Sequence, residues 1–297
     1  MKKIILLVVF SLSSLMAQVE NAVQSFISIK NTGVSEFLEK HPEFDGRGTI
    51  VMILDTGIDI GVDGLTKTST GEDKVLDVQD FTGQGDVAYF EAETDEDNDT
   101  LFFVNEDKEF KVAGAGKLSM KASDDKYFIG ELNENLWMNS GSGVKDVNHN
   151  GSKSDKFYFV VFKVEDNGES YWVTYIDTNL NGDLSDEVPF RNYKEKHQIV
   201  DLQGKDDIAS FTIALNIFHD EKKLSFFFDD GSHGTHCAGI ACGNSIGETT
   251  LNGVAPGAYL MGFKLGNNNY SGGATVTESM KKAYLYADKI SKERKEP

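Results

Sequence analysis

The apolar run from Thr49 to Leu54 constrains the fold of this 297-residue chain more than any other stretch. Apolar and polar positions do not alternate along it, which is typical of a strand buried on both faces of a parallel sheet. Asp55 follows directly, so a carboxylate lies at the carboxyl end of that strand. Ligands of open α/β sheets bind at this edge. The run therefore predicts an α/β fold with a functional site that includes Asp55.

A second informative stretch covers residues 229–244, which read Asp-Asp-Gly-Ser-His-Gly-Thr-His-Cys-Ala-Gly-Ile-Ala-Cys-Gly-Asn. Ser232 is a favourable N-cap, and it places His233 in the first turn of a predicted helix. The small residues of that helix indicate that neighbouring elements pack closely against it. A histidine at the start of such a helix is a candidate general base, provided that a carboxylate and a nucleophile lie beside it.

The segments around these two stretches differ in pattern. Tyr259 to Leu265 predicts another buried strand, and residues 275–292 carry apolar side chains at helical spacing. Residues 66–228 contain short alternating or aromatic runs separated by Gly, Asn and Asp, which is typical of a β-rich module. Within them, Glu91 to Asp99 holds six acidic residues in nine and is predicted to be a solvated loop tip.

The first 17 residues have the three regions of a secretory signal peptide. Lys2 and Lys3 precede an apolar run from Ile4 to Phe10, and cleavage is expected after Ala17. The run is shorter than the roughly 20 residues that span a bilayer. The sequence thus predicts an exported protein, secreted or periplasmic, with no membrane span after the signal is removed.

Charge and cysteine content narrow the class further. The net charge of −19 argues against a nucleic-acid partner, because a basic surface is needed to neutralise the phosphate backbone. Two cysteines exclude a disulfide framework. Cys237 and Cys242 lie about 140° apart on the predicted helix, so a bond between them would break it. We expect both to be small buried apolar residues rather than reactive thiols. No second Cys/His pair stands at ligand spacing, so zinc is not predicted.

Three blocks in the chain closely resemble those of subtilisin-like serine peptidases. Residues 53–59 read Ile-Leu-Asp-Thr-Gly-Ile-Asp, residues 232–239 read Ser-His-Gly-Thr-His-Cys-Ala-Gly, and residues 252–257 read Asn-Gly-Val-Ala-Pro-Gly. The resemblance implies a subtilisin-like parallel sheet with helices on both faces, interrupted by a β-rich inserted domain. It also implies that His233 is the general base and Asp55 its orienting partner. By the same resemblance His236 is a packed structural histidine, and Asp59 is structural or lies near the substrate cleft.

The large interval between Asp55 and His233 is similar to that of the tripeptidyl peptidase II-like branch of this family, which carries an insert there. The insert also resembles that branch locally, over residues 177–186 and 191–193. The implied domains are a signal peptide (1–17), the first part of the peptidase domain (18–65), the insert (66–228) and the continuation of the peptidase domain (229–297). Ser271, Gly272 and Gly273 resemble the loop whose backbone pairs with an extended substrate.

The chain departs from the family in lacking a Gly-Thr-Ser-Met-Ala block, which carries the nucleophile. The strand with the oxyanion-hole asparagine is not found either. We therefore expect an N-terminal fragment that is truncated before the serine block and is inactive as it stands. The resemblance implies acyl transfer on polypeptide substrates without any cofactor for the chemistry. The sequence makes no prediction of oligomeric state.

Three functions are compatible with these residues. The first is a serine-type endopeptidase, and the second is a tripeptidyl peptidase II-like exopeptidase. Ala274 stands where that exopeptidase branch is expected to hold the substrate amino terminus with an acidic residue, so the endopeptidase is favoured. The third is a non-catalytic, calcium-dependent binding or adhesion protein built on a peptidase shell.

Two loops of the insert share one pattern of oxygen-bearing side chains around a glycine. They contain Asp146, Asn148, Asn150 and Asp155 in the first loop, and Asp177, Asn179, Asn181 and Asp186 in the second. Alternate carboxylate and amide oxygens ahead of a glycine converge on one point in calcium loops. Position twelve, a bidentate glutamate in such loops, holds Phe157 and Val188 here. Two interpretations stay open, which are structural calcium and a pair of Asx-turns joining strands.

Overall fold

A computed structural model describes residues 29–202, 212–247, 251–268 and 277–294 of the chain. The predicted signal peptide and the predicted substrate loop, Ser271 to Gly273, lie outside the described residues, as does Ala274. The chain divides into two units. The first unit comprises residues 1–51, 63–74 and 238–259, and the second comprises residues 52–62, 75–237 and 260–297. No helix among the described residues has the length and apolar character that a membrane span requires.

The first unit is organised around buried polar groups that fix its turns. It contains η1 (Ile29–Thr32), α2 (Val34–Lys40) and the second half of α4 (His233–Cys242). The buried ammonium of Lys74 donates to the carbonyl oxygens of Pro256 and Ala258, at 2.8 and 2.9 Å. The N–H groups of Val254 and Ala255 donate to carbonyl oxygens in the last turn of α4, and the N–H of Gly253 donates to the carbonyl of Gly243 just beyond it. The block at residues 252–257 thus satisfies the carbonyl groups that a helix leaves unpaired at its end.

The parallel sheet contains three strands in the order β1 (Ile50–Asp55), β11 (Tyr259–Lys264) and β2 (Val75–Asp80). β11 pairs with β2 in parallel. β1 and β11 coincide closely with the two strands predicted from apolar runs, and α5 (Thr277–Arg294) with the predicted helix. β2 lies within residues 66–228, the range predicted for the insert, yet it belongs to this sheet. The domain boundaries therefore stay a prediction.

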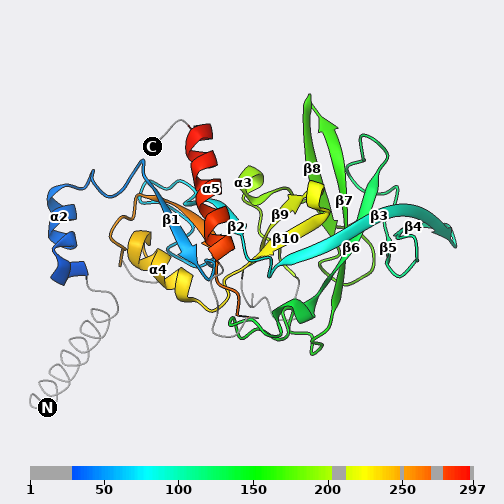
Figure 1. The fold of residues 1–297 in the computed structure, drawn as a ribbon, viewed down its shortest axis with the longest axis horizontal. Coiled ribbons are helices and arrows are strands. Elements are labelled where there is room, and N and C mark those ends of the chain that lie inside the picture. The colour runs from blue at the N-terminus through cyan, green and yellow to red at the C-terminus, as the bar shows by residue number, and fades with distance from the viewer. Residues whose placement is uncertain (1–28, 203–211, 248–250, 269–276, 295–297) are drawn as a thin grey trace, which may run out of the picture. The chain divides into compact units, whose positions relative to one another are not determined.

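The rest of the second unit is an antiparallel sheet of eight strands, which follow the order β5-β4-β3-β6-β7-β8, with β10 pairing both β3 and β9 (Figure 1). Their bounds are β3 (Asp86–Asp97), β4 (Thr100–Val104), β5 (Lys111–Ala113), β6 (Tyr127–Asn133), β7 (Lys156–Asp166), β8 (Glu169–Ile176), β9 (Ala214–Phe218) and β10 (Lys223–Phe227). Three short helices join them, η2 (Glu134–Trp137), α3 (Tyr193–Lys196) and η3 (His219–Glu221). The sheet confirms that the region is rich in β-structure.

The strand β7, which pairs with β6 and β8, shows why this sheet has two cores. Phe157, Phe159 and Val161 are buried in one apolar cluster, whereas Val160 and Phe162 are buried in another. Successive side chains of a strand point to opposite faces, so both faces of β7 are covered. An uninterrupted apolar run is the expected sequence of such a strand.

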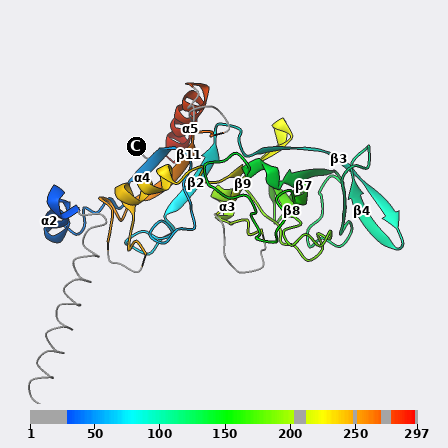
Figure 2. The same ribbon diagram turned by 90° about the horizontal axis from the view of Figure 1, so that it is seen from below.

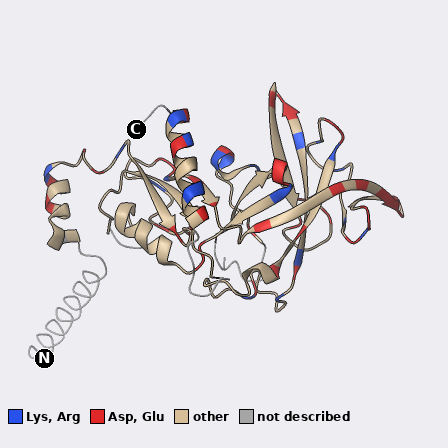
Figure 3. Cartoon of the chain, viewed as in Figure 1, with Lys and Arg blue, Asp and Glu red and all other residues tan. Residues whose placement is uncertain are grey.

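The acidic segment from Glu91 to Asp99 is part of a β-hairpin, so the prediction of a loop tip was wrong. β3 continues to Asp97, and Figure 2 shows β4 folding back along it. Asn98 and Asp99 make the turn with φ of 50° and 64°, a left-handed geometry that Asn and Asp tolerate well. Acidic residues, coloured red in Figure 3, recur along this hairpin. Pairing to β4 and β6 holds the strand despite its charge.

Candidate active site

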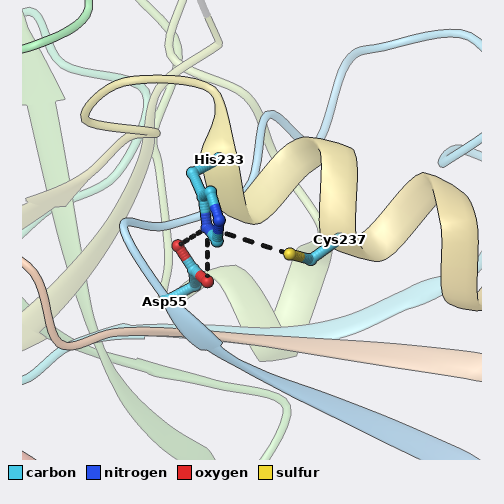
Figure 4. A group of neighbouring side chains, drawn as sticks. All are labelled: Asp55, His233 and Cys237. Atoms are coloured by element: carbon cyan, nitrogen blue, oxygen red, sulfur yellow. Dashed lines mark hydrogen bonds and ion pairs between the residues drawn. The ribbon is translucent and has the colours of Figure 1, made fainter.

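The carboxylate of Asp55 and the imidazole of His233 face each other (Figure 4). Asp55 is the last residue of β1, and His233 is the first of α4. Nδ1 of His233 lies 2.8 Å from both carboxylate oxygens of Asp55. An ionised carboxylate only accepts hydrogen bonds, so Nδ1 carries the proton and Nε2 is left as an acceptor. The imidazole side chain is 72% exposed, and it can accept a proton from a group that approaches from solvent.

The backbone around Asp55 fixes the position of its carboxylate. The N–H of Thr56 donates to one carboxylate oxygen at 2.7 Å. The main-chain carbonyl of Asp55 accepts from the N–H groups of Leu265 and Gly266, at 2.7 and 3.1 Å. The end of β1 is therefore tied to the end of β11, and the carboxylate projects from a rigid strand end.

A buried carboxylate, Asp229, joins the Asp55 turn to the start of α4. It accepts hydrogen bonds from the hydroxyl groups of Thr56, at 2.8 Å, and Thr235. The same two hydroxyl groups accept backbone N–H groups, from Gly234 at 3.1 Å and from Asp59 at 2.8 Å. The network thus fixes the backbone beside Asp55 and the first turn of α4, which carries His233. The sequence pattern alone does not reveal this network, although each of the two resembling blocks supplies one of the threonines.

The helix begins where it was predicted to begin, with a different cap. Ser232 precedes α4 with φ of 66°, and its main-chain carbonyl accepts the N–H of His236 at 3.0 Å. The free N–H groups of the first turn are bound by Thr56 and Asp229. A negative charge at this end is favoured by the helix dipole. Asp229 thus acts as the capping carboxylate.

Two glycines allow the strand end and the helix to approach. A Cβ atom on Gly234 would overlap the carbonyl oxygen of Gly57, and one on Gly57 would overlap the carbonyl oxygen of Phe228. Gly57 also has φ of 112°, which L side chains rarely adopt. The distance between Asp55 and His233 therefore depends on the absence of side chains at both positions.

The comparison with known families identifies the family of this chain. The model of the Subtilase family matches residues 46–293, most of the chain. The chain belongs to the subtilase family. The predicted family of serine peptidases and the predicted subtilisin-like α/β fold are confirmed.

Several proteins are similar to this subtilase over most of its length. Tripeptidyl-peptidase 2 of Oryza sativa subsp. japonica is 29% identical over 86% of this chain, as is that of Arabidopsis thaliana. Pyrolysin of Pyrococcus furiosus is 25% identical over 75% of the chain and 18% of its own length. A crystal structure of Tripeptidyl Peptidase 2 has a TM-score of 0.63 at 20% identity, over 89% of this chain and 24% of that one. The subtilase chain spans 22% of the length of the two plant proteins.

His236, predicted to be a packed structural histidine, is exposed in this subtilase, so that prediction was wrong. The side of α4 that meets the Asp55 turn is formed by Gly234. His236 lies two residues further on, about 200° round the helix, and so points away from that contact. Asp59 is half-buried, and its carboxylate accepts the N–H of Gly61 at 3.0 Å, a local structural role.

The two cysteines differ in their surroundings. Cys242 is fully buried and its Sγ donates to the carbonyl of Ala238 at 3.4 Å, as expected of a packed apolar residue. Cys237 is only half-buried, and its Sγ lies 3.8 Å from Nδ1 of His233. Burial and the nearby Asp55 carboxylate raise the pKa of the Cys237 thiol. A raised pKa keeps it protonated and weakly nucleophilic at neutral pH.

A buried lysine supports the loop that leads toward the predicted substrate segment. Lys264, the last residue of β11, donates to the carbonyl of Phe228 and lies 4.0 Å from Asp230. Burial lowers the pKa of Lys264 to about 8. Asp230 accepts the N–H of Asn268 at 2.9 Å, and the amide of Asn268 donates to the main chain of Asp230 at 2.8 Å. The chain just before residue 269 is therefore anchored three residues from His233.

The two candidate calcium loops have matching hydrogen bonds. The first aspartate of each, Asp146 or Asp177, accepts two backbone N–H groups from its own loop. The last aspartate of each, Asp155 or Asp186, accepts from two asparagine amides, those of Asn148 and Asn150 in the first loop and of Asn179 and Asn181 in the second. The oxygens that would bind calcium thus already gather in two closed loops of Asx-turn type. Structural calcium stays a prediction.

Proposed function

We propose that this subtilase chain supplies the acid–base pair of a serine endopeptidase. The hydrogen bond from Nδ1 of His233 to Asp55 supports the proposal, because it leaves Nε2 free to act as a base. Nε2 takes the proton of a serine hydroxyl as its oxygen attacks the peptide carbonyl, and Asp55 stabilises the imidazolium. The imidazolium then protonates the leaving amine, and water hydrolyses the acyl-enzyme by the same steps in reverse order.

The nucleophile in this proposal comes from polypeptide outside these 297 residues. The chain contains no Gly-Thr-Ser-Met-Ala block, and it spans 22% of the length of its plant relatives. A base without a nucleophile and oxyanion donors cannot complete acyl transfer. We therefore propose that the 297-residue chain alone is inactive.

Release of tripeptides is the second candidate, and the comparisons favour it. Relatives from rice, Arabidopsis, Caenorhabditis elegans and Drosophila melanogaster are all tripeptidyl-peptidase 2. A fluorogenic tripeptide with a free amino terminus and the same peptide with a blocked one separate the two modes. An endopeptidase cleaves the blocked peptide, whereas a tripeptidyl peptidase requires the free amino terminus.

Export is part of the proposal, and a non-catalytic binding role is the third candidate function. The pattern of residues 1–17 supports export, and fractionation of cells expressing the full gene would detect an exported product of reduced mass. The non-catalytic alternative predicts that the gene encodes no serine block and that calcium changes binding to a partner. Sequencing the gene beyond codon 297 distinguishes it from both peptidases.

The decisive experiment is serine-directed labelling of the whole gene product with a fluorophosphonate. Labelling and hydrolysis are both expected, and both should fall in His233→Ala. Asp55→Asn is expected to lower kcat by about 10⁴-fold, because the imidazole then adopts the wrong tautomer. Full activity in His233→Ala refutes the proposed base.

A further inference from the structure

Three different ligand atoms meet where β1 ends and α4 begins. They are a carboxylate oxygen of Asp55, Nδ1 of His233 and Sγ of Cys237, and all lie within 4.8 Å of one another (Figure 4). His233 and Cys237 are four residues apart on α4, so they share one face of the helix. Asp55 approaches that face from a separate strand. Oxygen, nitrogen and sulfur donors therefore surround one point that is open to solvent on the side of His233.

We propose that Asp55, His233 and Cys237 bind a thiophilic divalent cation such as Zn²⁺, with water as the fourth ligand. Tetrahedral zinc with ordinary bond lengths places a nitrogen and a carboxylate oxygen about 3.4 Å apart, and a nitrogen and a sulfur about 3.6 Å apart. The corresponding distances here are 2.8 Å and 3.8 Å. Displacements of about half an ångström or less bring these two distances to the zinc values, and the third distance, between the carboxylate oxygen and Sγ, is at most 4.8 Å. Mixed thiolate, imidazole and carboxylate donors favour zinc over magnesium or calcium.

Binding requires two proton movements, and the structure accommodates both. The Cys237 thiol releases its proton to solvent, and the neutral imidazole of His233 moves its proton from Nδ1 to Nε2. Two anionic ligands then match the charge of the cation, so the complex is neutral. The hydrogen bond between Nδ1 and Asp55 is replaced by bonds from both groups to the metal.

The same proton movement would switch off the base. With a metal on Nδ1, the hydrogen sits on Nε2, which can no longer accept a proton from a serine. This consequence rests on the proposed function, whereas the binding site itself does not. The cation would thus be a reversible inhibitor that competes with the correct tautomer of His233.

Cys242 provides a matched control. It lies on the same helix, but it is buried and its thiol donates to a main-chain carbonyl. Cys242 therefore has the thiol of a zinc ligand but lacks the histidine and aspartate beside it.

The spacing of residues in the sequence does not reveal the metal site, because its third ligand, Asp55, comes from a distant part of the chain.

The test is a calorimetric titration of Zn²⁺ into the 297-residue chain, its Cys237→Ala variant and its Cys242→Ala variant. We expect one thiolate-dependent site in the wild type and in Cys242→Ala. Loss of a direct ligand should weaken binding by more than about 100-fold in Cys237→Ala, since loss of supporting groups alone costs about 10- to 100-fold. Circular dichroism checks that each variant is folded, and Cys237→Ser replaces Cys237→Ala if the latter is not.

Co²⁺ identifies the ligands directly. A thiolate-to-cobalt absorption band is expected with the wild type and Cys242→Ala, and it should be absent from the Cys237 variants. Equal zinc affinity in folded wild type and Cys237 variants, or a cobalt complex without the thiolate band, overturns the proposal. Metal bound only by the aspartate loops would give a cobalt complex without the thiolate band. Serine-directed labelling of the whole gene product uses no metal, so the proposed function and the metal site can fail independently.

Discussion

The contact between Gly234 and Gly57 predicts that Gly234→Ala separates His233 from Asp55. A Cβ at position 234 would overlap the backbone carbonyl of Gly57 and press on Asp55. A backbone atom cannot rotate away as a flexible side chain can, so the first turn of α4 must move. The hydrogen bond that orients the imidazole is then lengthened or lost.

Opposing effects set the size of the change. Alanine gains about 0.5–1 kcal/mol over glycine within a helix, whereas forcing a methyl group into a filled space costs about 1–3 kcal/mol. The rigid neighbour places Gly234→Ala at the upper end of that range, for a net loss of about 2 kcal/mol. Gly239→Ala is the control, because a Cβ on Gly239 of the same helix meets no atom within 4 Å. That variant should gain about 0.5–1 kcal/mol.

Urea unfolding of the two variants measures this difference, which we expect to be about 3 kcal/mol. Proton NMR of the Nδ1–H of His233 reports the local geometry, and its hydrogen-bonded resonance should persist in Gly239→Ala and disappear in Gly234→Ala. Equal stability of the two variants, with the resonance kept in both, would refute the close contact as the determinant of the pair.

Further predictions concern the surrounding network, pH and calcium. Asp229→Ala should lower the free energy of unfolding by about 3 kcal/mol, because two hydroxyl groups lose a charged acceptor; unchanged urea denaturation contradicts this. A hydrogen-bonded arginine holds the pKa of Asp45 below its usual range. The ionised carboxylate therefore adds to the free energy of unfolding above about pH 4, and this stabilisation is lost on further acidification. The same pH dependence should be missing in Asp45→Asn. Burial and a neighbouring lysine lower the pKa of His219, so the free energy of unfolding should fall as pH drops below about 6.5. The fluorescence of Trp172, which stacks on His219, should change over the same pH range. His219→Phe should remove the stability change and the fluorescence change. Calcium at millimolar concentration should release heat on titration, and less with Asp177→Asn; no heat with the wild type contradicts the calcium hypothesis.

The fold could be predicted where burial and sequence pattern agree. The run before Asp55 is apolar throughout, and the strand is where that run predicts it. β2 was missed because Asp77 and Gln79 break its apolar pattern. Both are buried, and Asp77 accepts the hydroxyl of Tyr286 on α5 at 2.5 Å. A polar strand that a distant helix satisfies cannot be recognised from local pattern alone.

The site could be predicted in part for a similar reason. Short motifs identified Asp55 and His233, because each lies within a recognisable block. Asp229 and Cys237 acquire their roles only from contacts between those blocks, and those contacts depend on the fold. His236 is exposed because α4 packs against the Asp55 turn through the face that carries Gly234. The presence of two histidines in one turn does not reveal which face of the helix is packed.

The antiparallel sheet between the two blocks has a consequence for the order of folding. Asp55 and His233 are 178 positions apart, and closing an unstructured loop of that length costs about 4–5 kcal/mol of chain entropy. A folded sheet brings its own ends together and removes most of that cost. The acid–base pair should therefore form late, after the intervening strands have paired, and at a rate set by their long-range pairing. Refolding experiments that follow Nδ1 of His233 would then time the completion of the whole segment.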